Sequence, residues 1–409
     1  MERETFQVEL VTPCFLAGAE GSTEWRAASI RGQLRWWFRA VAGGCWKGDL
    51  GRVRREEARI FGSTERKSLI QVQALGDLET SKAPFERQCN AARLAKLWGD
   101  ERAETVRRLK VMRDDREVSS NPIHYLAFGP IVFRDRQLIV RPYLPAKSQV
   151  AFKLLWGAGV VEEETRKAFI KALWAWLNLG GVGAKSRKGF GALQCTVPNS
   201  MYRGPGTREE FLTQAKTLLR EARESVERPA WTHFSSRSRI LLGARTAGSW
   251  EEAMESLGAW LIGFRRRYGF PGDTRTLGGT ALANRDYEWA APNGHHAREN
   301  VPDRAGFGLP LPFRRKKDGE TVIWGEDGEV KEEADARRAS PLLLHVSKFG
   351  NVFVPVLTHL PAQFLPDRAR LKFKDHPKDP FRISDEQTGI IDQFLADLLR
   401  KGLIQEVAP

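Results

Sequence analysis

Apolar and polar residues follow the same order of spacings twice along the chain. In its first two hundred residues, apolar residues at every second position predict strands at 5–11, 69–74, 149–155 and 189–197. The 3.6-residue spacing of a helix covers 29–42, 49–61 and 162–179, and a hairpin is predicted over 131–143. The order strand, helix, strand, strand, helix, strand, with insertions, is typical of a ferredoxin-like domain.

The pattern begins again after a long amphipathic helix that is predicted over 207–226. Strands are expected at 239–242, 309–313, 342–347 and 352–358, and helices over 249–267 and 384–401. Both helices open with capping-box residues, Ser249 with Glu252 and Ser384 with Gln387. We therefore predict an α+β protein of two tandem ferredoxin-like (RRM-type) units with insertions. The expected division is residues 1–200, a connecting helix at 201–230, and residues 231–409.

Two charged segments with weak apolar patterning interrupt this order. Residues 77–118 predict an insertion with some helix, and residues 315–338 predict a loop or excursion. Neither segment carries a motif that indicates a function, so the sequence leaves the role of both open.

The composition adds a preference for anionic partners. Among 409 residues, 65 Lys and Arg stand against 51 Asp and Glu, and the formal net charge is +14. Such an excess favours nucleic acid or an acidic protein surface as partner. No stretch approaches the roughly 18 apolar residues of a membrane span, so we expect no membrane partner. The N-terminus leads directly into a strand pattern without a signal peptide, so we expect a cytoplasmic protein.

Cysteine and histidine positions do not predict a metal centre. The four cysteines form no CxxC pair, and in a cytosolic chain they are expected to be buried, reduced thiols. They are Cys14, Cys45, Cys89 and Cys195. The doublet His295–His296 lies in a polar segment without further ligands nearby. We therefore expect neither a metal nor a cofactor.

The segment from Gly180 to Gly191, with the sequence GGVGAKSRKGFG, is the sharpest chemical feature of the chain. Glycines let backbone N–H groups approach a phosphate, and the basic and hydroxyl side chains add charge and a donor. This composition suits a nucleic-acid backbone, and a flexible solvent loop is the alternative. A P-loop is not expected, because Leu179 and Ala184 occupy its two glycine positions. The candidate RNA-binding residues are Gly181, Gly183, Lys185, Ser186, Arg187, Lys188 and Phe190.

A basic helix near the N-terminus is the second candidate. Ser29 can cap this helix, and one of its faces is apolar. The adjacent face carries Arg31, Arg35 and Arg39 at four-residue intervals. Trp36 lies off the centre of the apolar face, where its ring can stack on a base. The pattern fits a docked helix that presents guanidinium groups, and it equally fits a solvated face beside a packed tryptophan pair.

Together these motifs resemble the RAMP superfamily of CRISPR proteins, and more narrowly the large tandem-RAMP subunits of type III-B (Cmr) effector complexes. The segments that carry the resemblance are TP at 12–13 with the glycines after it, SIRGQLRWWFR at 29–39, IFGST at 60–64, the glycine-rich segment, FGLP at 307–310 and RRASPL at 337–342. The resemblance implies two RAMP domains of ferredoxin-like fold in tandem.

The same resemblance implies a function in antiviral defence as an RNA-binding subunit that is not an enzyme. The implied partners are the CRISPR RNA, at its 3′ part, the target RNA paired with it, and the other RAMP subunits of the complex. The residues that would line the RNA path are Arg31, Arg35, Arg39, Lys185, Arg187 and Lys188.

Two other functions stay open at this point. Some RAMP relatives cleave CRISPR precursors by acid–base catalysis, so a metal-independent endoribonuclease would use His124 or Tyr125, although a lone histidine beside apolar residues is typical of packing. His345 lies inside an apolar run and is expected to be packed. The acidic residues form no cluster that would predict metal-dependent hydrolysis. A structural subunit would instead use the basic surface against acidic proteins.

Overall fold

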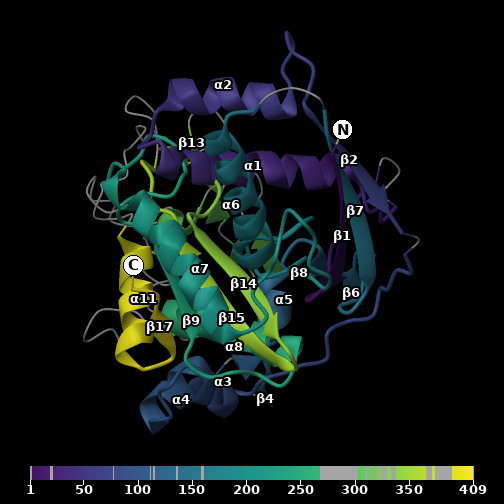
Figure 1. The fold of residues 1–409 in the computed structure, drawn as a ribbon. Helices are drawn as coiled ribbons and strands as arrows, with labels where there is room; N and C mark the ends of the chain where they lie inside the picture. The colour runs from purple at the N-terminus through teal and green to yellow at the C-terminus, as the bar shows by residue number, and fades with distance from the viewer. Residues whose placement is uncertain are drawn as a thin grey trace.

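The structure is a computed structural model. It describes most of the chain, in a series of residue ranges. These ranges are 2–18, 22–76, 78–110, 112–113, 116–134, 137–157, 161–267, 303–308, 311–312, 314–317, 320–323, 329–332, 338–364, 371–373 and 389–408. They contain two four-stranded antiparallel sheets, one formed by each half of the chain (Figure 1). The α+β class expected from the sequence is therefore confirmed.

The first sheet has the strand order β2-β7-β1-β8, and all its neighbours are antiparallel. Its strands are β1 (Glu2–Leu10), β2 (Ile70–Leu75), β7 (Gln149–Trp156) and β8 (Leu193–Cys195). Side chains of β1 alternate between burial and exposure, and Phe6 stacks on Phe152 of β7 at 4.7 Å between ring centroids. Helices α1 (Ala27–Cys45) and α6 (Glu163–Leu179) pack on each other and share one core with this sheet.

The second sheet has the order β14-β15-β9-β17 and is also antiparallel. Its strands are β9 (Arg239–Gly243), β14 (Leu342–Phe349), β15 (Val352–His359) and β17 (Ile404–Glu406), and its helices are α8 (Trp250–Arg267) and α11 (Ile390–Arg400). Numbered along the chain, the four strands of each sheet stand in the same order, second, third, first, fourth. The repeat of spacings in the sequence thus corresponds to a repeat of topology.

Helix α7 (Arg208–Glu221) lies between the two halves, as the pattern of its apolar residues predicts. Phe211 contacts Trp174 of α6 at 5.6 Å and Phe349 of β14 at 5.8 Å between ring centroids. A short 3-10 turn, η1 (Ala222–Glu224), follows α7. The connector is therefore part of the core and links the first sheet to the second.

The remaining elements belong to insertions and connections. They are α2 (Leu50–Phe61), α3 (Ala91–Leu97), α4 (Ala103–Leu109), β3 (Met112–Arg113), β4 (Arg116–Glu117), α5 (Pro122–Leu126), β5 (Ile131–Arg134), β6 (Gln137–Val140), η2 (Asp303–Phe307), β10 (Leu311–Pro312), β11 (Arg314–Lys317), β12 (Glu320–Ile323), β13 (Glu329–Glu332) and β16 (Leu371–Phe373). Strands β5 and β6 form the predicted hairpin.

The insertion at 77–118 fastens the first half to the second. Figure 1 shows α3 and α4 beside α8, and the carboxylate of Glu255 in α8 is buried at this contact. Arg93 of α3 donates two hydrogen bonds to Glu255, at 2.8 and 2.6 Å, and the Cys89 thiol donates a third at 2.8 Å. The prediction that this insertion contains some helix is confirmed. Its contact with α8 joins the two halves, which its charged composition did not indicate.

Three local predictions differ from the structure. Helix α1 begins at Ala27 with Arg26 as N-cap and no side-chain cap, so Ser29 lies inside the first turn and the cap prediction is wrong. The last strand of the first half covers only 193–195, because the backbone before it turns through the glycine loop. Residues 315–338 contain strands of an antiparallel hairpin, β11 with β12, where a loop was expected.

Two further predictions lie wholly or partly outside the described residues. The capping box at 384–387 and the doublet at 295–296 are not described, and of the strand expected at 309–313 only 311–312 are. Among the helices in the described part of the chain, none combines the length and the apolarity that a bilayer crossing needs.

Candidate nucleic-acid interface

Residues 180–191, called the glycine loop below, connect α6 to β8 and are folded tightly onto the protein's own backbone. Gly183 and Gly191 have φ angles of +84° and +66°, a conformation that side chains disfavour. A Cβ atom on Gly183 would collide with the carbonyl oxygen of Phe15, and one on Gly191 with that of Val182. The N–H of Val182 donates to the Gly191 carbonyl at 3.0 Å. These glycines therefore allow backbone to pack on backbone.

Two other predicted residues also support the loop from within. A Cβ on Gly181 would lie 2.8 Å from the carbonyl oxygen of Phe190. The Phe190 ring has 0% exposure and packs against Phe15 and Phe85, at 5.2 and 5.9 Å between ring centroids. Gly181, Gly183 and Phe190 thus shape the loop, and the surface that it presents comes from residues 185–188.

The tip of the glycine loop is a tight turn of basic residues. Lys185 adopts a φ of +62°, and its carbonyl accepts hydrogen bonds from the N–H groups of Lys188 at 2.7 Å and Phe190 at 3.4 Å. The turn separates the side chains. Ser186 and Arg187 line a cavity on the α1 side. The Lys185 side chain lies instead beside Gly129, after α5, where an added Cβ would be 3.7 Å from its ammonium nitrogen.

Arg187 brings the two sequence candidates into contact. Its guanidinium carbon lies 4.7 Å from the centre of the Trp36 ring, a cation–π geometry. Its Nη1 atom also donates to the carbonyl of Ser340 at 2.8 Å, so the residue reaches the second half. Burial, followed by the positive charge of Arg338, lowers the pKa of Arg187 to about 10. The side chain nevertheless stays charged at neutral pH.

The cavity beside this contact has a volume of about 220 Å³ and combines an indole, positive charges and a hydroxyl. Its lining residues are Gly32, Gln33, Trp36, Trp37, Arg39, Gly180, Gly181, Ser186, Arg187 and Leu343. Trp36 is half-buried and stands edge-on to Trp37, at 4.9 Å and an interplanar angle of 87°. Such a set of groups can stack a flat base and bind a phosphate in one place.

The arginines of α1 are engaged with the neighbouring helix α2. Arg31 donates to the carbonyl of Phe61, Arg35 donates to the carboxylate of Glu57, and Arg39 lies 3.8 Å from the same carboxylate. The Glu57 side chain is 8% exposed, whereas Arg35 and Arg39 are 41% and 45% exposed. The structure therefore places the predicted basic stripe at a helix–helix contact, with partial access to solvent. Its contact with RNA stays a prediction.

The cations of the glycine loop lack such acidic partners. Within the described residues, Lys185, Arg187 and Lys188 take part in no ion pair with a carboxylate, whereas Arg35 and Arg39 share Glu57. Burial lowers the pKa of Lys185, and burial together with nearby cations lowers the pKa of Lys188 to about 7. The loop is the less compensated of the two basic motifs.

The histidines considered for catalysis are packed. His124 lies in α5, half-buried, and burial lowers its pKa. His345 is buried in β14 with its Nδ1 atom 2.6 Å from the carbonyl oxygen of Gly180, and burial lowers its pKa to about 4. The Tyr125 hydroxyl accepts a hydrogen bond from Arg265. Both histidines are thus neutral at physiological pH and serve the packing of the helix and strand around them.

Sequence reasoning missed Arg265 and Arg338, whose charges lower the pKa values of loop residues. Arg265 lies 77 residues beyond Lys188 and Arg338 lies 151 residues beyond Arg187, and no local pattern connects them to the loop. Only the packing of the second half against the first brings these charges together.

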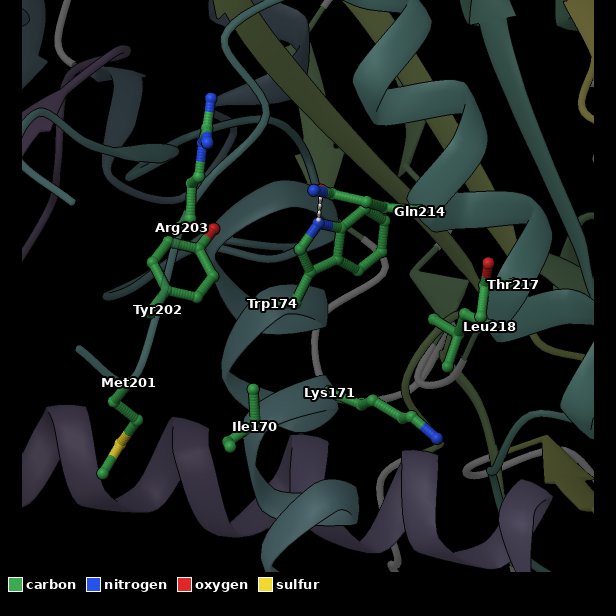
Figure 2. Close-up of a pocket in the computed structure, with 9 residues that line it drawn as sticks. All are labelled: Ile170, Lys171, Trp174, Met201, Tyr202, Arg203, Gln214, Thr217 and Leu218. Carbon is green, nitrogen blue, oxygen red and sulfur yellow. Dashed lines mark hydrogen bonds between the residues drawn. The ribbon is translucent and has the colours of Figure 1, made fainter. Parts of the chain in front are cut away.

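A second hollow of about 270 Å³ lies between α6 and α7, and Figure 2 shows the side chains around it. The indole N–H of Trp174 donates to Gln214 at 2.5 Å, and Lys171 donates to Glu221 at 2.5 Å. Because these polar groups are already paired and the other walls are mainly apolar, the hollow offers less for an anionic ligand than the cavity beside Trp36.

All four cysteines are free, two of them buried and two half-buried. Burial raises the pKa of every one, so they are protonated thiols at neutral pH. In the described part of the chain, no three His, Cys, Asp or Glu residues come together as they would around a metal ion.

Comparison with known proteins gives matches in sequence and in structure. The RAMP superfamily matches residues 7–194. In Pyrococcus furiosus, the protein named "CRISPR system Cmr subunit Cmr1-2" is 29% identical over 205 residues, 49% of this chain and 99% of that protein. "CRISPR system Cmr subunit Cmr1-1" of the same organism is 26% identical over 199 residues, 48% of each protein.

The crystal structure of Cmr1 from Pyrococcus furiosus, in its apo form, resembles the whole chain. The superposition covers 100% of this chain and 99% of that one, with a TM-score of 0.53 and 18% sequence identity. At this identity the likeness shows a shared fold and nothing finer. It extends over both sheets, whereas the superfamily match covers the first.

Proposed function

We propose that this protein is a subunit of a type III-B CRISPR (Cmr) effector complex, and the match of residues 7–194 to the RAMP superfamily, which the sequence motifs also resemble, supports this. The relatives named as Cmr subunits in Pyrococcus furiosus support this proposal. The fold agrees with the proposal, because the likeness to the Cmr1 crystal structure covers the full length of the chain.

The matching strand orders support a finer structural interpretation. Each half contributes strand, helix, strand, strand, helix, strand, and each antiparallel sheet has the order second, third, first, fourth. This is the order of a ferredoxin-like unit. We interpret the chain as two such RAMP units in tandem, with α7 and the insertion at 77–118 binding one to the other.

We assign RNA binding to the glycine loop and the exposed side of α1, and one observation carries this assignment. Arg187 of the loop lies over Trp36 of α1, which joins two motifs 151 residues apart (187 − 36) into one site. Lys185 and Lys188 add charges without carboxylate partners in the described residues. A phosphate held by these cations would leave its base close to the Trp36 ring.

The proposed partners are the 3′ part of the CRISPR RNA, its paired target RNA and the other RAMP subunits of the complex. We propose binding without catalysis, because His124 and His345 are packed and neutral. Phosphate contacts of this kind carry little base preference, and their affinity falls steeply with salt.

Purification of the tagged protein from its native host, with sequencing of the RNA that accompanies it, tests this function. We expect guide RNAs with mature ends, together with other RAMP proteins. Heterogeneous cellular RNA alone would indicate a general RNA-binding protein, and a preparation free of RNA would overturn the assignment. Incubating the purified protein with a repeat-containing RNA tests the absence of catalysis, since shortened RNA that disappears with His124→Ala would contradict it.

A further inference from the structure

The glycine loop forms the seam between the two halves of the molecule. A Cβ on Gly189 would lie 2.6 Å from the sulfur of Met254 in α8, so the loop backbone is pressed onto that helix. The carbonyl of Arg187 accepts a hydrogen bond from the N–H of Leu344 in β14 at 3.1 Å. Residues 187–189 therefore lie between the first half and two elements of the second.

Four cations from both halves meet at this seam. Lys185, Arg187 and Lys188 come from the loop, and Arg265 comes from the last turn of α8. Burial lowers the pKa of Lys188, and the charges of Arg265, Lys185 and Arg187 lower it further, in that order. Their contacts also place two of them together. The Lys185 ammonium nitrogen lies beside Gly129, just after α5, and Arg265 donates to Tyr125 within α5, so both side chains lie along the same short segment.

Aromatic rings and one hydroxyl hold Arg265 in this position. Its Nη1 atom donates to the hydroxyl of Tyr125, and its guanidinium carbon lies 5.6 Å from the Tyr125 ring and 5.3 Å from the Phe307 ring. Its Nε atom is buried without a hydrogen-bond partner among the described residues. The side chain is thus fixed by neutral groups, and its charge is not neutralised by them.

The Lys188 ammonium group is in a similar situation. It forms no hydrogen bond and no ion pair within the described residues, although the residue is half-buried. Burying positive charge beside positive charge is costly unless an anion compensates it. The arrangement therefore suits a protein that meets its counter-charge in a ligand.

We propose that Lys185 and Lys188 of the first half and Arg265 of the second form a single clamp for one phosphate group, which is bound across the seam. This inference rests on the proposed function and adds that one phosphate of the bound RNA touches both halves. Binding would then hold the halves together, since the anion attracts cations that otherwise repel one another across the junction.

Arg265→Gln tests the clamp with a labelled single-stranded RNA, measured by fluorescence anisotropy over a series of salt concentrations. We expect the affinity to fall about tenfold and the salt slope to decrease by about one. Arg203→Gln is the matched control, because it removes the same charge from a side chain that is 80% exposed and lies away from the seam. The control should bind RNA as the unchanged protein does. Arg265→Lys should restore most of the affinity, because the charge is kept.

Hydrogen exchange on the unchanged protein gives a second measurement that needs no variant. RNA should slow exchange at the amides of 185–190 and also at Leu344 and the last turns of α8. Protection confined to the first half would overturn the clamp. Inorganic phosphate and a dinucleoside monophosphate, added in place of RNA, distinguish a site for free phosphate from a site for a phosphodiester. The clamp would also be overturned if neither anion stabilised the protein against heat and Arg265→Gln bound RNA as well as the unchanged protein does.

These measurements keep the two proposals separate. RNA that binds equally to Arg265→Gln and Arg203→Gln would refute the clamp and leave the RNA-binding assignment standing. An unchanged protein that binds no RNA would refute the proposed function itself. Loss of affinity in Arg265→Gln without loss of fold, together with protection in both halves, supports both.

Discussion

Two basic segments of this chain look alike in sequence and differ in the fold. The stripe on α1 consists of Arg31, Arg35 and Arg39, and these side chains are bound by α2 through the Phe61 carbonyl and the Glu57 carboxylate. The cations of the glycine loop have no carboxylate partner in the described residues. A count of positive charges along the sequence therefore overstates how much of the charge on the α1 stripe is available to a ligand.

The difference has a physical cause. The α1 arginines are partly solvated and share a carboxylate, so their charge is screened by water and by the protein. The loop cations are half-buried, and burial lowers the pKa of each, so their charge is screened less and acts over a longer distance. An anion that reaches the loop supplies the negative charge that the loop cations lack in the free protein. An anion at α1 has to compete with the Glu57 carboxylate.

The strongest test of this comparison replaces three cations in each segment. Lys185→Gln, Arg187→Gln and Lys188→Gln combined should weaken RNA binding by about a hundredfold or more and reduce the salt slope by about three. The corresponding triple variant Arg31→Gln, Arg35→Gln and Arg39→Gln should lose about tenfold or less, because these groups are already partly neutralised. Anisotropy titrations over several salt concentrations measure both. An equal loss in the two variants would show that the distinction has no bearing on RNA.

The glycines of the two segments sharpen the comparison. Gly191→Ala should lower the free energy of unfolding by about 2–3 kcal/mol, because φ is +66° and a Cβ would meet the Val182 carbonyl. Gly32 in α1 is the matched control, since a Cβ there meets nothing within 4 Å. Gly32→Ala should raise stability by about 0.5–1 kcal/mol, as expected for a helix interior. Urea unfolding of the two variants measures both changes, and a stable Gly191→Ala protein would contradict the backbone-packing role.

Local patterns in the sequence were sufficient to predict most of the strands and helices. Phe6, Val8 and Leu10 alternate because one face of β1 is buried, and that alternation is visible without a structure. The helix start at Ala27 was not predictable from Ser29, because α1 uses no side-chain cap. The hairpin β11–β12 was missed because a polar strand lacks the apolar alternation on which the prediction depends.

The sequence indicated the individual residues of the candidate site, but it did not predict which of them come into contact. Lys185 and Arg187 were recognised by composition, and the Trp36 ring by its place on the helix. That Arg187 lies over Trp36 depends on how the glycine loop folds back onto α1. The pairing of Arg35 with Glu57 and the packing of the glycine loop on α8, at Gly189 and Met254, are tertiary contacts, and one sequence carries no record of them.

The pH dependence of stability should reveal the buried charge at Lys188. An unfolded chain keeps its lysines protonated up to the ordinary pKa of 10.5, whereas burial and neighbouring cations lower the pKa of folded Lys188 to about 7. Between these values the unfolded state binds more protons, so the free energy of unfolding rises with pH. Below pH 7 the full cost of the buried charge is present. Lys188→Met removes this cost and should be more stable than the unchanged protein at pH 6, by about 1–3 kcal/mol.

The stability difference between Lys188→Met and the unchanged protein should shrink as the pH rises above 7. Urea unfolding from pH 6 to 9.5 measures it, and Lys216→Met, on the exposed face of α7, corrects for the loss of one lysine. Parallel stability curves for Lys188→Met and the unchanged protein would show that the ammonium group is solvated. That result would remove the strongest contrast between the loop and α1.

The smallest expected effect comes from removing the carboxylate that partly neutralises the arginine stripe on α1. Glu57→Gln removes the carboxylate that Arg35 and Arg39 share, and it should lower the free energy of unfolding by about 1–2 kcal/mol, discounted for the partial exposure of both arginines. The same substitution releases two guanidinium groups, so RNA affinity should rise by about threefold. Glu163→Gln, at the exposed start of α6, removes one negative charge without uncovering an arginine of α1 and serves as control. If the RNA affinities of Glu57→Gln and Glu163→Gln are the same, the α1 arginines have no access to RNA, and the glycine loop alone accounts for binding.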